Sequence, residues 1–178
     1  MRDLQERRTP VPAVGARRRL LIPAVAAVVV AVDQLTKTWA LEHLRLGVAR
    51  HVIGPTNFLL TYNTGAAFGL GHGVTPFVEA AVVLLVVWLV AASRRATLGG
   101  SRLMTLGLGL LLGGAIGNLA DRVFRHPKGY PGGVVDFIQG VSWWPVFNVA
   151  DASIVVGVAA LIVAFWLRDR SADGQAGG

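Results

Sequence analysis

The stretch from Gly113 to Asp151 decides the fold and reads GGAIGNLADRVFRHPKGYPGGVVDFIQGVSWWPVFNVAD. Both of its ends lie in apolar segments, yet it carries a series of amide and charged side chains: Asn118, Asp121, Arg122, Asp136, Asn148 and Asp151. An ionisable side chain in hydrocarbon costs about 3 kcal/mol or more, so such residues in apolar segments are functional candidates. We therefore interpret this stretch as the centre of a polar site at one end of a membrane protein.

Composition indicates an integral membrane protein of one domain. The chain has 178 residues, a mean hydropathy of +0.56 and 53% hydrophobic residues, and its charges are nearly absent from four apolar blocks. The sequence has no cysteine, which excludes disulfides, thiolate metal sites and a cysteine nucleophile. The net charge of +7 does not indicate a nucleic acid partner, because the basic residues lie beside apolar segments, where they set topology.

We expect an all-α membrane fold of four transmembrane helices, with a small extracytoplasmic surface segment rich in β-structure. The first helix begins with LLIPAVAAVVVAV at Leu20–Val32, a run that also fits the apolar core of a secretory signal. Because no clear small-residue cleavage site follows, we favour a retained helix of about 20 residues. The other three helices are expected at Pro76–Ala92, Leu103–Ala120 and Phe147–Leu167.

The four-helix domain is expected to span residues 20–168. Residues 1–19 hold six arginines and two prolines, which predicts a disordered basic tail, and residues 169–178 form a second, polar tail. The two ends of the chain and the loop 93–102 carry 11 of the 17 Lys and Arg residues. By the positive-inside rule both termini are cytoplasmic, so residues 42–75 and 122–146 share the outer face.

The first helix carries a charged pair, Asp33 and Lys37, four residues apart on one face. Two compatible interpretations remain: an ion pair near the membrane interface, or a polar strut that faces the bundle. On the third helix, Gly109, Gly113 and Gly117 recur every four residues and predict a groove that lets another helix approach closely.

Residues 42–75 mix alternating apolar residues with turn residues and glycines. This pattern predicts short strands and turns that lie on the membrane surface. The tripeptide Asn63–Gly65 fits either a tight turn or an edge whose amide and backbone line a bound peptide. Both interpretations remain open at this point.

The end of the third helix presents Asn118, Asp121 and Arg122 on one face, because their spacing is i, i+3 and i+4. We expect a structural role for Asp121 with Arg122 beside it, because an adjacent guanidinium keeps a carboxylate ionised. Arg122 is also placed to reach a lipid phosphate.

The start of the fourth helix carries Asn148 and Asp151, with the spacing of an N-cap and the acid of a capping box. Capping does not account for Asp136, which lies between Val135 and Phe137 with no adjacent cation. A carboxyl group in apolar surroundings favours its neutral form. We therefore predict that Asp136 and Asp151 form a catalytic pair.

Two neighbouring carboxyl groups can share one proton and work as acid and base. The ionised group takes a proton from water, while the protonated group polarises a peptide carbonyl and later protonates the leaving amine. The sequence shows no serine–histidine pairing, no HExxH and no paired-histidine metal site. We therefore expect no metal and no cofactor, and an aspartyl mechanism if the protein is a hydrolase.

Five blocks in order closely resemble the signature of the lipoprotein signal peptidases, also called signal peptidase II. They are DQLTK (33–37), NTGAAFG (63–69), GGAIGNLADR (113–122), VVDF (134–137) and FNVADA (147–152). Together they extend over about 120 of the 178 residues. One matching block would be weak evidence for the resemblance, but five blocks in order on a four-helix hydropathy pattern are specific evidence for it.

The resemblance implies an aspartyl endopeptidase of the bacterial cytoplasmic membrane, with its active site at the extracytoplasmic face. Its substrate would be a diacylglyceryl-modified prolipoprotein, cut on the N-terminal side of the lipidated cysteine. The family motifs place the catalytic pair at Asp136 and Asp151 and supporting or binding roles at Asp33, Asn63, Asn118, Asp121, Arg122 and Asn148. To these we add Lys37 as a strut, Gly65 on the peptide-binding edge, and Phe68 against the signal helix.

The resemblance also implies inhibition by globomycin-type cyclic peptides. We expect membrane phospholipid as a partner, no nucleic acid and a monomer. Two features depart from the family pattern: the arginine-rich tail 1–19 and the extended span Phe124–Gly133. They bear on regulation and substrate preference rather than on the reaction.

Rival functions fit the sequence less well. An ion-pathway subunit would use a proton relay through Asp33, Lys37, Asp136 and Asp151. It predicts carboxylates spread through the membrane depth, whereas these gather at one end. A presenilin-type protease needs a GxGD motif, but Gly107 and Gly109 are followed by Leu110. A structural protein with capped helices leaves Asp136 unexplained.

Overall fold

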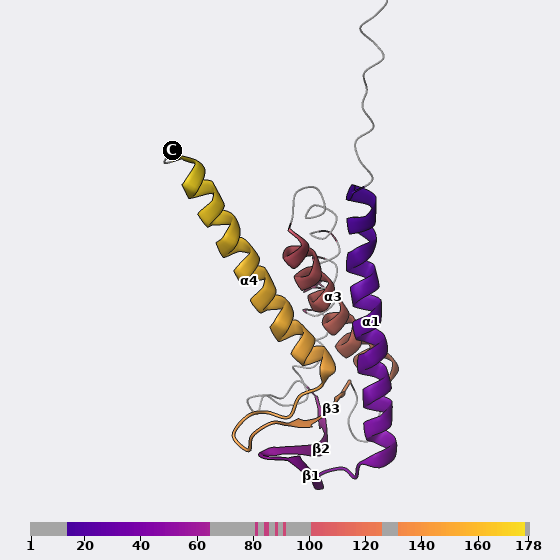
Figure 1. The fold of residues 1–178 in the computed structure, drawn as a ribbon. Helices are drawn as coiled ribbons and strands as arrows, with labels where there is room; N and C mark the ends of the chain where they lie inside the picture. Colours follow the sequence, from indigo (N-terminus) through magenta and orange to yellow (C-terminus); the bar gives the residue numbers. More distant parts are fainter. Residues whose placement is uncertain are drawn as a thin grey trace, which may run out of the picture.

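The computed structural model describes residues 14–64, 101–125 and 132–176, together with five single positions between 81 and 91. The elements follow in the order α1 (Val14–His43), β1 (Ala49–Ile53), β2 (Thr56–Asn63), α3 (Arg102–Phe124), β3 (Val134–Gln139) and α4 (Val149–Ala176). In Figure 1 the helices α1, α3 and α4 stand above the small sheet, which lies at their lower ends.

Three of the four expected membrane helices are confirmed. Within the described residues, three helices are long and apolar enough to span a membrane: Leu20–His43, Arg102–Phe124 and Val149–Arg170. The expected helix Pro76–Ala92 lies largely outside the described residues. Five of its positions are described and all are helical: Ala81, Leu84, Leu85, Trp88 and Ala91. The count of four spans stays a prediction.

Two helices extend beyond their expected bounds. The α1 helix begins at Val14, inside the segment 1–19 that we expected to be disordered, and α4 continues past residue 168 to Ala176. Starting a helix is costly, but adding residues to an existing helix is not, and Arg and Ala are good helix formers. The polar flanks therefore continue the membrane helices for several residues.

The glycine groove on α3 is confirmed, and α1 lies in it. A Cβ atom at Gly113 would lie 2.6 Å from the Cβ of Val29, and one at Gly117 would lie 2.7 Å from Oδ2 of Asp33. The partners on α1 are also four residues apart, so the two helices run parallel. Only glycine permits so close an approach of the two backbones.

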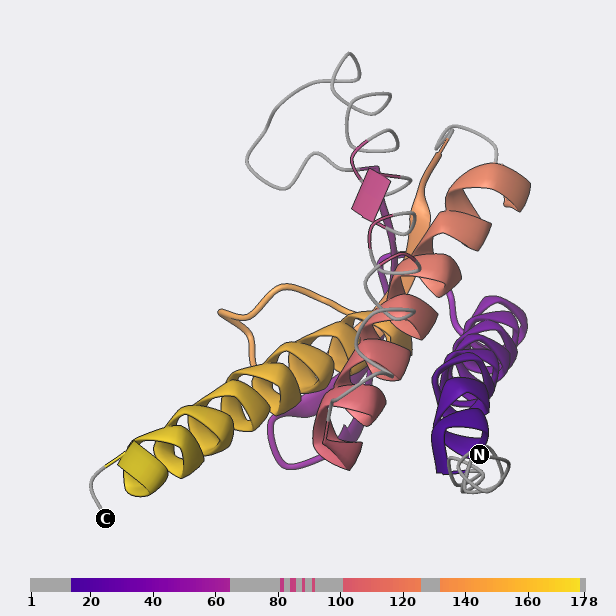
Figure 2. The same ribbon diagram turned by 90° about the horizontal axis from the view of Figure 1, so that it is seen from above.

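The opposite side of α3 packs antiparallel against α4. Gly114 faces Ala150 near the start of α4, and Gly107 faces Gly157 farther along it. Figures 1 and 2 show that α4 meets the other two helices at the sheet end and diverges from α1 toward its C-terminus. The beginning of α4 is therefore the part held most closely by the bundle.

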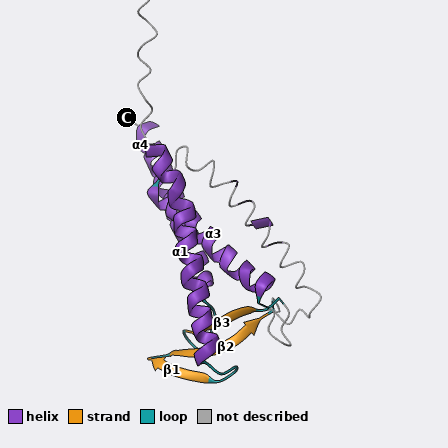
Figure 3. Ribbon diagram, turned by 90° about the vertical axis from the view of Figure 1, so that its right-hand side faces the viewer, coloured by secondary structure: helices purple, strands orange, loops and turns teal. Residues whose placement is uncertain are grey.

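The all-α class is wrong, because an antiparallel three-stranded sheet in the order β1-β2-β3 closes the end of the bundle (Figure 3). We expected strands in 42–75, and β1 and β2 are there. The third strand comes from the span after α3, where Val134, Val135, Asp136 and Phe137 are all buried. A strand buried on both faces lacks the alternating pattern that identifies a half-exposed strand.

Aromatic side chains fix the sheet to the end of α1. The rings of Trp39 and Phe58 lie 5.2 Å apart in an edge-to-face arrangement, and Phe137 lies 6.4 Å from Trp39 and 6.2 Å from Phe58. Such pairs add about 0.5–1.5 kcal/mol beyond the area that they bury. The cluster sets the position of β3 relative to the helices.

The helix contact at Gly113 gives a test of this packing. Replacement by alanine should lower the melting temperature in detergent, because the new methyl group would lie 2.9 Å from the Ala26 carbonyl oxygen. Overpacking costs about 1–3 kcal/mol, which exceeds the gain of about 1 kcal/mol in helix propensity. The control is Gly140→Ala, whose methyl group would have no neighbour closer than 4.0 Å. Equal melting temperatures would contradict the close α1–α3 contact.

Candidate active site

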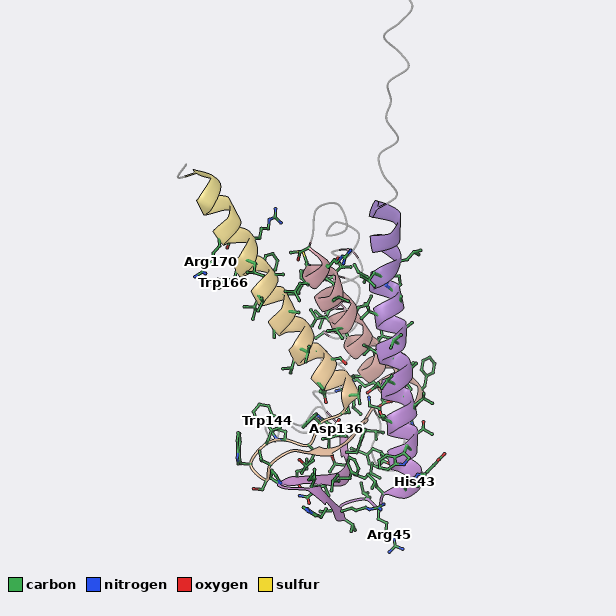
Figure 4. The ribbon with its side chains drawn as sticks, in the orientation of Figure 1. His43, Arg45, Asp136, Trp144, Trp166 and Arg170 are labelled. Atoms are coloured by element: carbon green, nitrogen blue, oxygen red, sulfur yellow. The ribbon has the colours of Figure 1, made fainter. Side chains whose placement is uncertain are left out.

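Asp136 lies on β3, where the sheet meets the ends of the helices (Figure 4). It is 2% exposed, opposite Thr61 of β2, and its chain neighbours Val135 and Phe137 are also buried. The side chain of Asn63, at the end of β2, also hydrogen-bonds to Asp136. The structure therefore brings Asn63 to the predicted catalytic residue.

Asp151 lies in the first turn of α4, in the capping box predicted from the sequence. Its backbone N–H donates to Oδ1 of Asn148 at 2.9 Å, and its own Oδ2 accepts the backbone N–H of Asn148 at 3.2 Å. This reciprocal pair satisfies two backbone donors at the start of the helix. The cap also fixes the rotamer of Asp151, so the hydrogen bonds that cap the helix also hold the carboxylate of Asp151 in place.

Two asparagine amides join the aspartates. Nδ2 of Asn148 donates to Oδ1 of Asp136 at 2.7 Å, and Nδ2 of Asn118 donates to Oδ1 of Asp151 at 2.8 Å. The two amides are bonded to each other, because Nδ2 of Asn148 also lies 3.1 Å from Oδ1 of Asn118. Residues from α3, from β3 and from the start of α4 thus form one hydrogen-bonded network.

The pKa of Asp136 is raised from 3.8 to about 7. Loss of hydration on burial is the main cause, and the nearby charge of Asp151 is the second. Hydrogen bonds from Asn148 and Asn63, and the charge of Lys37, lower this pKa and oppose the shift. Asp136 can therefore hold a proton at neutral pH, as a general acid must.

Lys37 is fully buried and contacts two carboxylates. Its Nζ lies 2.9 Å from Oδ2 of Asp33 and 3.0 Å from Oδ2 of Asp121, and it donates to Oδ1 of Asn118 at 2.9 Å. Asp33 is also fully buried and accepts the backbone N–H of Ala150 at 3.0 Å. The Asp33–Lys37 pair therefore faces the bundle, and it connects α1 to the start of α4.

Asp121 is held by partners from α1, from the end of α3 and from β3. It pairs with Lys37 and with Arg125, whose Nε lies 2.9 Å from Oδ1, while its Oδ2 also accepts the backbone N–H of Val135 at 3.0 Å. The expectation that Arg122 pairs with a carboxylate stays a prediction. Side chains four residues apart on a helix share a face, whereas adjacent ones point about 100° apart.

Arg122 braces the loop before β3. It is 8% exposed, and its Nη1 donates to the carbonyl oxygen of Gly132 at 3.0 Å. Gly132 has a φ of +67°, a conformation that glycine adopts without strain. The contact with a lipid phosphate suggested by the sequence does not suit so buried a side chain.

A pocket of about 280 Å³ opens beside Asp151. Its other lining residues are almost all apolar: Trp144, Phe147, Ala152, Val155 and Val156. Val155 and Val156 are 64% and 56% exposed, so this side of α4 faces away from the bundle. Figure 4 shows Trp144 on the same outward side. A carboxylate at the wall of an apolar pocket is suited to a ligand with an apolar part.

The family model described as signal peptidase (SPase) II matches residues 25–167. The chain belongs to the signal peptidase II family. The lipoprotein signal peptidase of Mycobacterium leprae (strain Br4923) is 44% identical over 155 residues, covering 83% of this chain and 72% of that protein. That of Rhodococcus jostii (strain RHA1) is also 44% identical, covering 86% of this chain and 76% of that protein.

The fold also matches a solved structure. A bacterial membrane enzyme determined by the in meso method at 1.9 Å resolution superposes with a TM-score of 0.68 at 31% identity, covering 80% of this chain and 90% of that one. The resemblance inferred from the five sequence blocks is confirmed, and the chain is a membrane peptidase of the signal peptidase II family.

Two residues of the site were missed by the sequence analysis. Gln34 donates to Oδ1 of Asp121 at 3.1 Å and to the carbonyl oxygen of Gly117 at 3.1 Å, and Arg125 donates to Oε1 of Gln34 at 3.1 Å. The spacing of Arg125 from Asp121 could have identified it, since i and i+4 charges of opposite sign pair on a helix. Gln34 lies in the block DQLTK (33–37), and this position could have identified it.

Two predicted residues of the peptidase site, Gly65 and Phe68, lie outside the described residues, so their roles stay predictions. Within the part of the chain that the structure describes, no group of three His, Asp or Glu side chains could hold a metal ion.

The raised pKa of Asp136 makes the stability of the protein depend on pH. The folded form of this carboxyl group binds its proton more tightly than the unfolded form, so ionising it destabilises the fold as pH rises from about 4 to about 7. Asp136→Asn should therefore melt at a higher temperature than the wild type above pH 7, and the difference should shrink toward pH 4. The measurement is thermal unfolding in detergent across this range.

Glu42→Gln is the control, because it removes an exposed carboxylate that lies near the end of α1. A pH-independent difference between Asp136→Asn and the wild type would contradict the raised pKa.

Proposed function

We propose that this protein is a membrane aspartyl endopeptidase that removes signal peptides from diacylglyceryl-modified prolipoproteins, on the N-terminal side of the lipidated cysteine. The observation that carries the proposal is the pair Asp136 and Asp151, which come from a strand and a helix and are joined through Asn148. Membership of the signal peptidase II family supports the substrate class. The relatives carry the name lipoprotein signal peptidase.

The hydrogen bonds support different roles for the two carboxyl groups. Asp151 accepts an N–H at each oxygen, from Asn118 and from the backbone of Asn148, so it presents only lone pairs to the substrate. Asp136 holds the shared proton, as its raised pKa allows. Asp151 is therefore the base and Asp136 the acid.

In the proposed reaction, Asp151 takes a proton from water as the water oxygen attacks the carbonyl carbon of the scissile peptide. Asp136 gives its proton to the carbonyl oxygen, which becomes a hydroxyl group of the tetrahedral intermediate. When the intermediate collapses, the C–N bond breaks, Asp151 returns its proton to the leaving amine, and Asp136 recovers its own. Atoms and charges balance, and neither a metal nor a cofactor takes part.

The position of the site suits a lipid-anchored substrate. Four carboxylates gather where the helices meet the sheet: Asp33, Asp121, Asp136 and Asp151. A proton pathway would instead distribute them through the depth of the membrane. We place this end at the extracytoplasmic face of the bacterial cytoplasmic membrane, with both termini cytoplasmic, because the two ends of the chain and the loop 93–102 carry 11 of the 17 Lys and Arg residues.

The same proposal includes sensitivity to globomycin-type inhibitors, contact with membrane phospholipid and activity as a monomer. The pocket beside Asp151 would receive an apolar part of the substrate.

The catalytic pair is tested by replacing each aspartate with the isosteric asparagine. Asp136→Asn and Asp151→Asn should each lower kcat by about 10²–10⁴-fold or more on a lipidated prolipoprotein in detergent. Asp121→Asn should keep measurable turnover, because Asp121 contacts Lys37, Arg125 and a backbone N–H rather than the other two aspartates. In the wild type, kcat/KM should fall as pH rises through about 7, where Asp136 loses its proton. Full cleavage by Asp136→Asn would move the pair to Asp121 and Asp151.

The pocket is tested by filling it. Val156→Trp should raise KM for the lipidated substrate more than it changes kcat, because the indole ring occupies space that the substrate needs. Val28→Trp on α1 is the matched control, since Val28 is similarly exposed, at 63%, and does not line the pocket. An unchanged KM in Val156→Trp would remove the pocket from substrate binding.

A further inference from the structure

We propose that Lys37 is a positioning residue for the catalytic pair: by holding the carbonyl oxygen of Asn118, it turns the amide so that the NH₂ group donates to Asp151. The inference rests on the function proposed above. It extends that function to a side chain on α1, whose hydrogen bonds and ion pairs go to Asp33, Asp121 and Asn118.

The ammonium group of Lys37 has one fixed arrangement. It carries three N–H donors and has three acceptors, at 2.9 Å on Asp33, 3.0 Å on Asp121 and 2.9 Å on Asn118. The side chain is 0% exposed, so no water competes for these donors. Rotation away from Asn118 would leave a buried donor unsatisfied, which costs about 1–3 kcal/mol or more for a charged group.

An amide has a donor end and an acceptor end, and Lys37 selects between them. An ammonium group only donates, so only the oxygen of Asn118 can face it. In the reversed orientation the NH₂ group of Asn118 would face the ammonium group, and its oxygen would face the carboxylate of Asp151. Both contacts would be repulsive. The observed orientation instead gives Asp151 a donor at 2.8 Å.

The same oxygen of Asn118 also orders the second amide. It accepts Nδ2 of Asn148 at 3.1 Å, and that nitrogen donates to Oδ1 of Asp136 at 2.7 Å. The oxygen of Asn148 faces the opposite way, toward the backbone N–H of Asp151. Lys37 therefore anchors one end of a chain of donors that supplies each aspartate with one amide N–H.

If Lys37 had a purely structural role, it would only balance the negative charge of the carboxylates around it. The charged groups around Lys37 and the catalytic pair are Asp33 on α1, Asp121 on α3, Arg125 at the C-cap of α3, Asp136 on β3 and Asp151 on α4. Arg125 offers a matched control, because it also pairs with Asp121 and also ties α3 to α1, through Gln34 and Thr38. Within the described residues, the hydrogen bonds and ion pairs of Arg125 go to Asp121, Gln34 and Thr38.

The experiment compares Lys37→Met and Arg125→Met with the wild type, using cleavage of a lipidated prolipoprotein in detergent at several pH values. Lys37→Met should lower kcat by about 10²-fold with a smaller change in KM, as expected for misplaced catalytic groups. The alkaline limb of its pH–rate profile, where cleavage falls at high pH, should move to higher pH, because the charge of Lys37 lowers the pKa of Asp136. Arg125→Met should keep the wild-type limb. An unmoved limb in Lys37→Met would overturn the inference.

A double-mutant cycle with Asn118→Leu tests whether the effect of Lys37 on the catalytic pair passes through Asn118. If Lys37 acts through Asn118, adding Lys37→Met to Asn118→Leu should cause little further loss of kcat, since the interaction is already gone. Losses that multiply in the double variant would show that Lys37 acts elsewhere, and would overturn the inference.

A second variant covers the case in which Lys37→Met does not fold. Lys37→Met combined with Asp33→Asn removes one buried charge of each sign, and the new amide oxygen can still accept the Ala150 N–H. The same loss of kcat and the same shift of the alkaline limb are expected. Failure of the wild type to cleave would overturn the proposed function itself, whereas a normal wild type with an unmoved limb in this variant would overturn only the role of Lys37.

Discussion

A lysine ammonium group without access to water must be surrounded by acceptors, and the end of this helix bundle is built around that requirement. Lys37 is enclosed by Asp33, Asp121 and Asn118, and removing a partner from such a buried group costs several kcal/mol. The requirement extends into the packing. Asp33 can lie against α3 only because residue 117 is glycine, where a Cβ atom would fall 2.7 Å from the carboxylate.

The proposed catalytic pair depends on this arrangement although it lies on other elements. Asp33 accepts the N–H of Ala150 and so holds the first turn of α4, which carries Asp151. Asp121 accepts the N–H of Val135 and so holds the strand that carries Asp136. One buried cluster of charges therefore places both aspartates.

Much of the fold and of the site could be predicted from the sequence, wherever the pattern involves residues that are close together in the chain. Apolar length predicted three membrane helices that the structure describes, the glycine repeat predicted the α1–α3 contact, and Asn148 with Asp151 predicted a capping box. The sequence analysis erred where partners are distant in the chain or lie between elements. It did not predict the partners that Asp121 has on α1, which are Gln34 and Lys37. It also missed β3, because a strand buried on both faces has no alternation to reveal it.

The sequence by itself determined the class of chemistry and the family. A membrane protein without cysteine, with two aspartates beside amides in ordered motifs, leaves an aspartyl mechanism as the one that its residues supply. Only the tertiary structure decided how the two aspartates differ. The burial of Asp136, the two donors on Asp151 and the orientation of Asn118 by Lys37 all arise from contacts between α1, α3, β3 and α4. Hydration and hydrogen-bond direction depend on neighbours in space, and residues 30 to more than 80 positions apart in the chain become neighbours only when the helices pack.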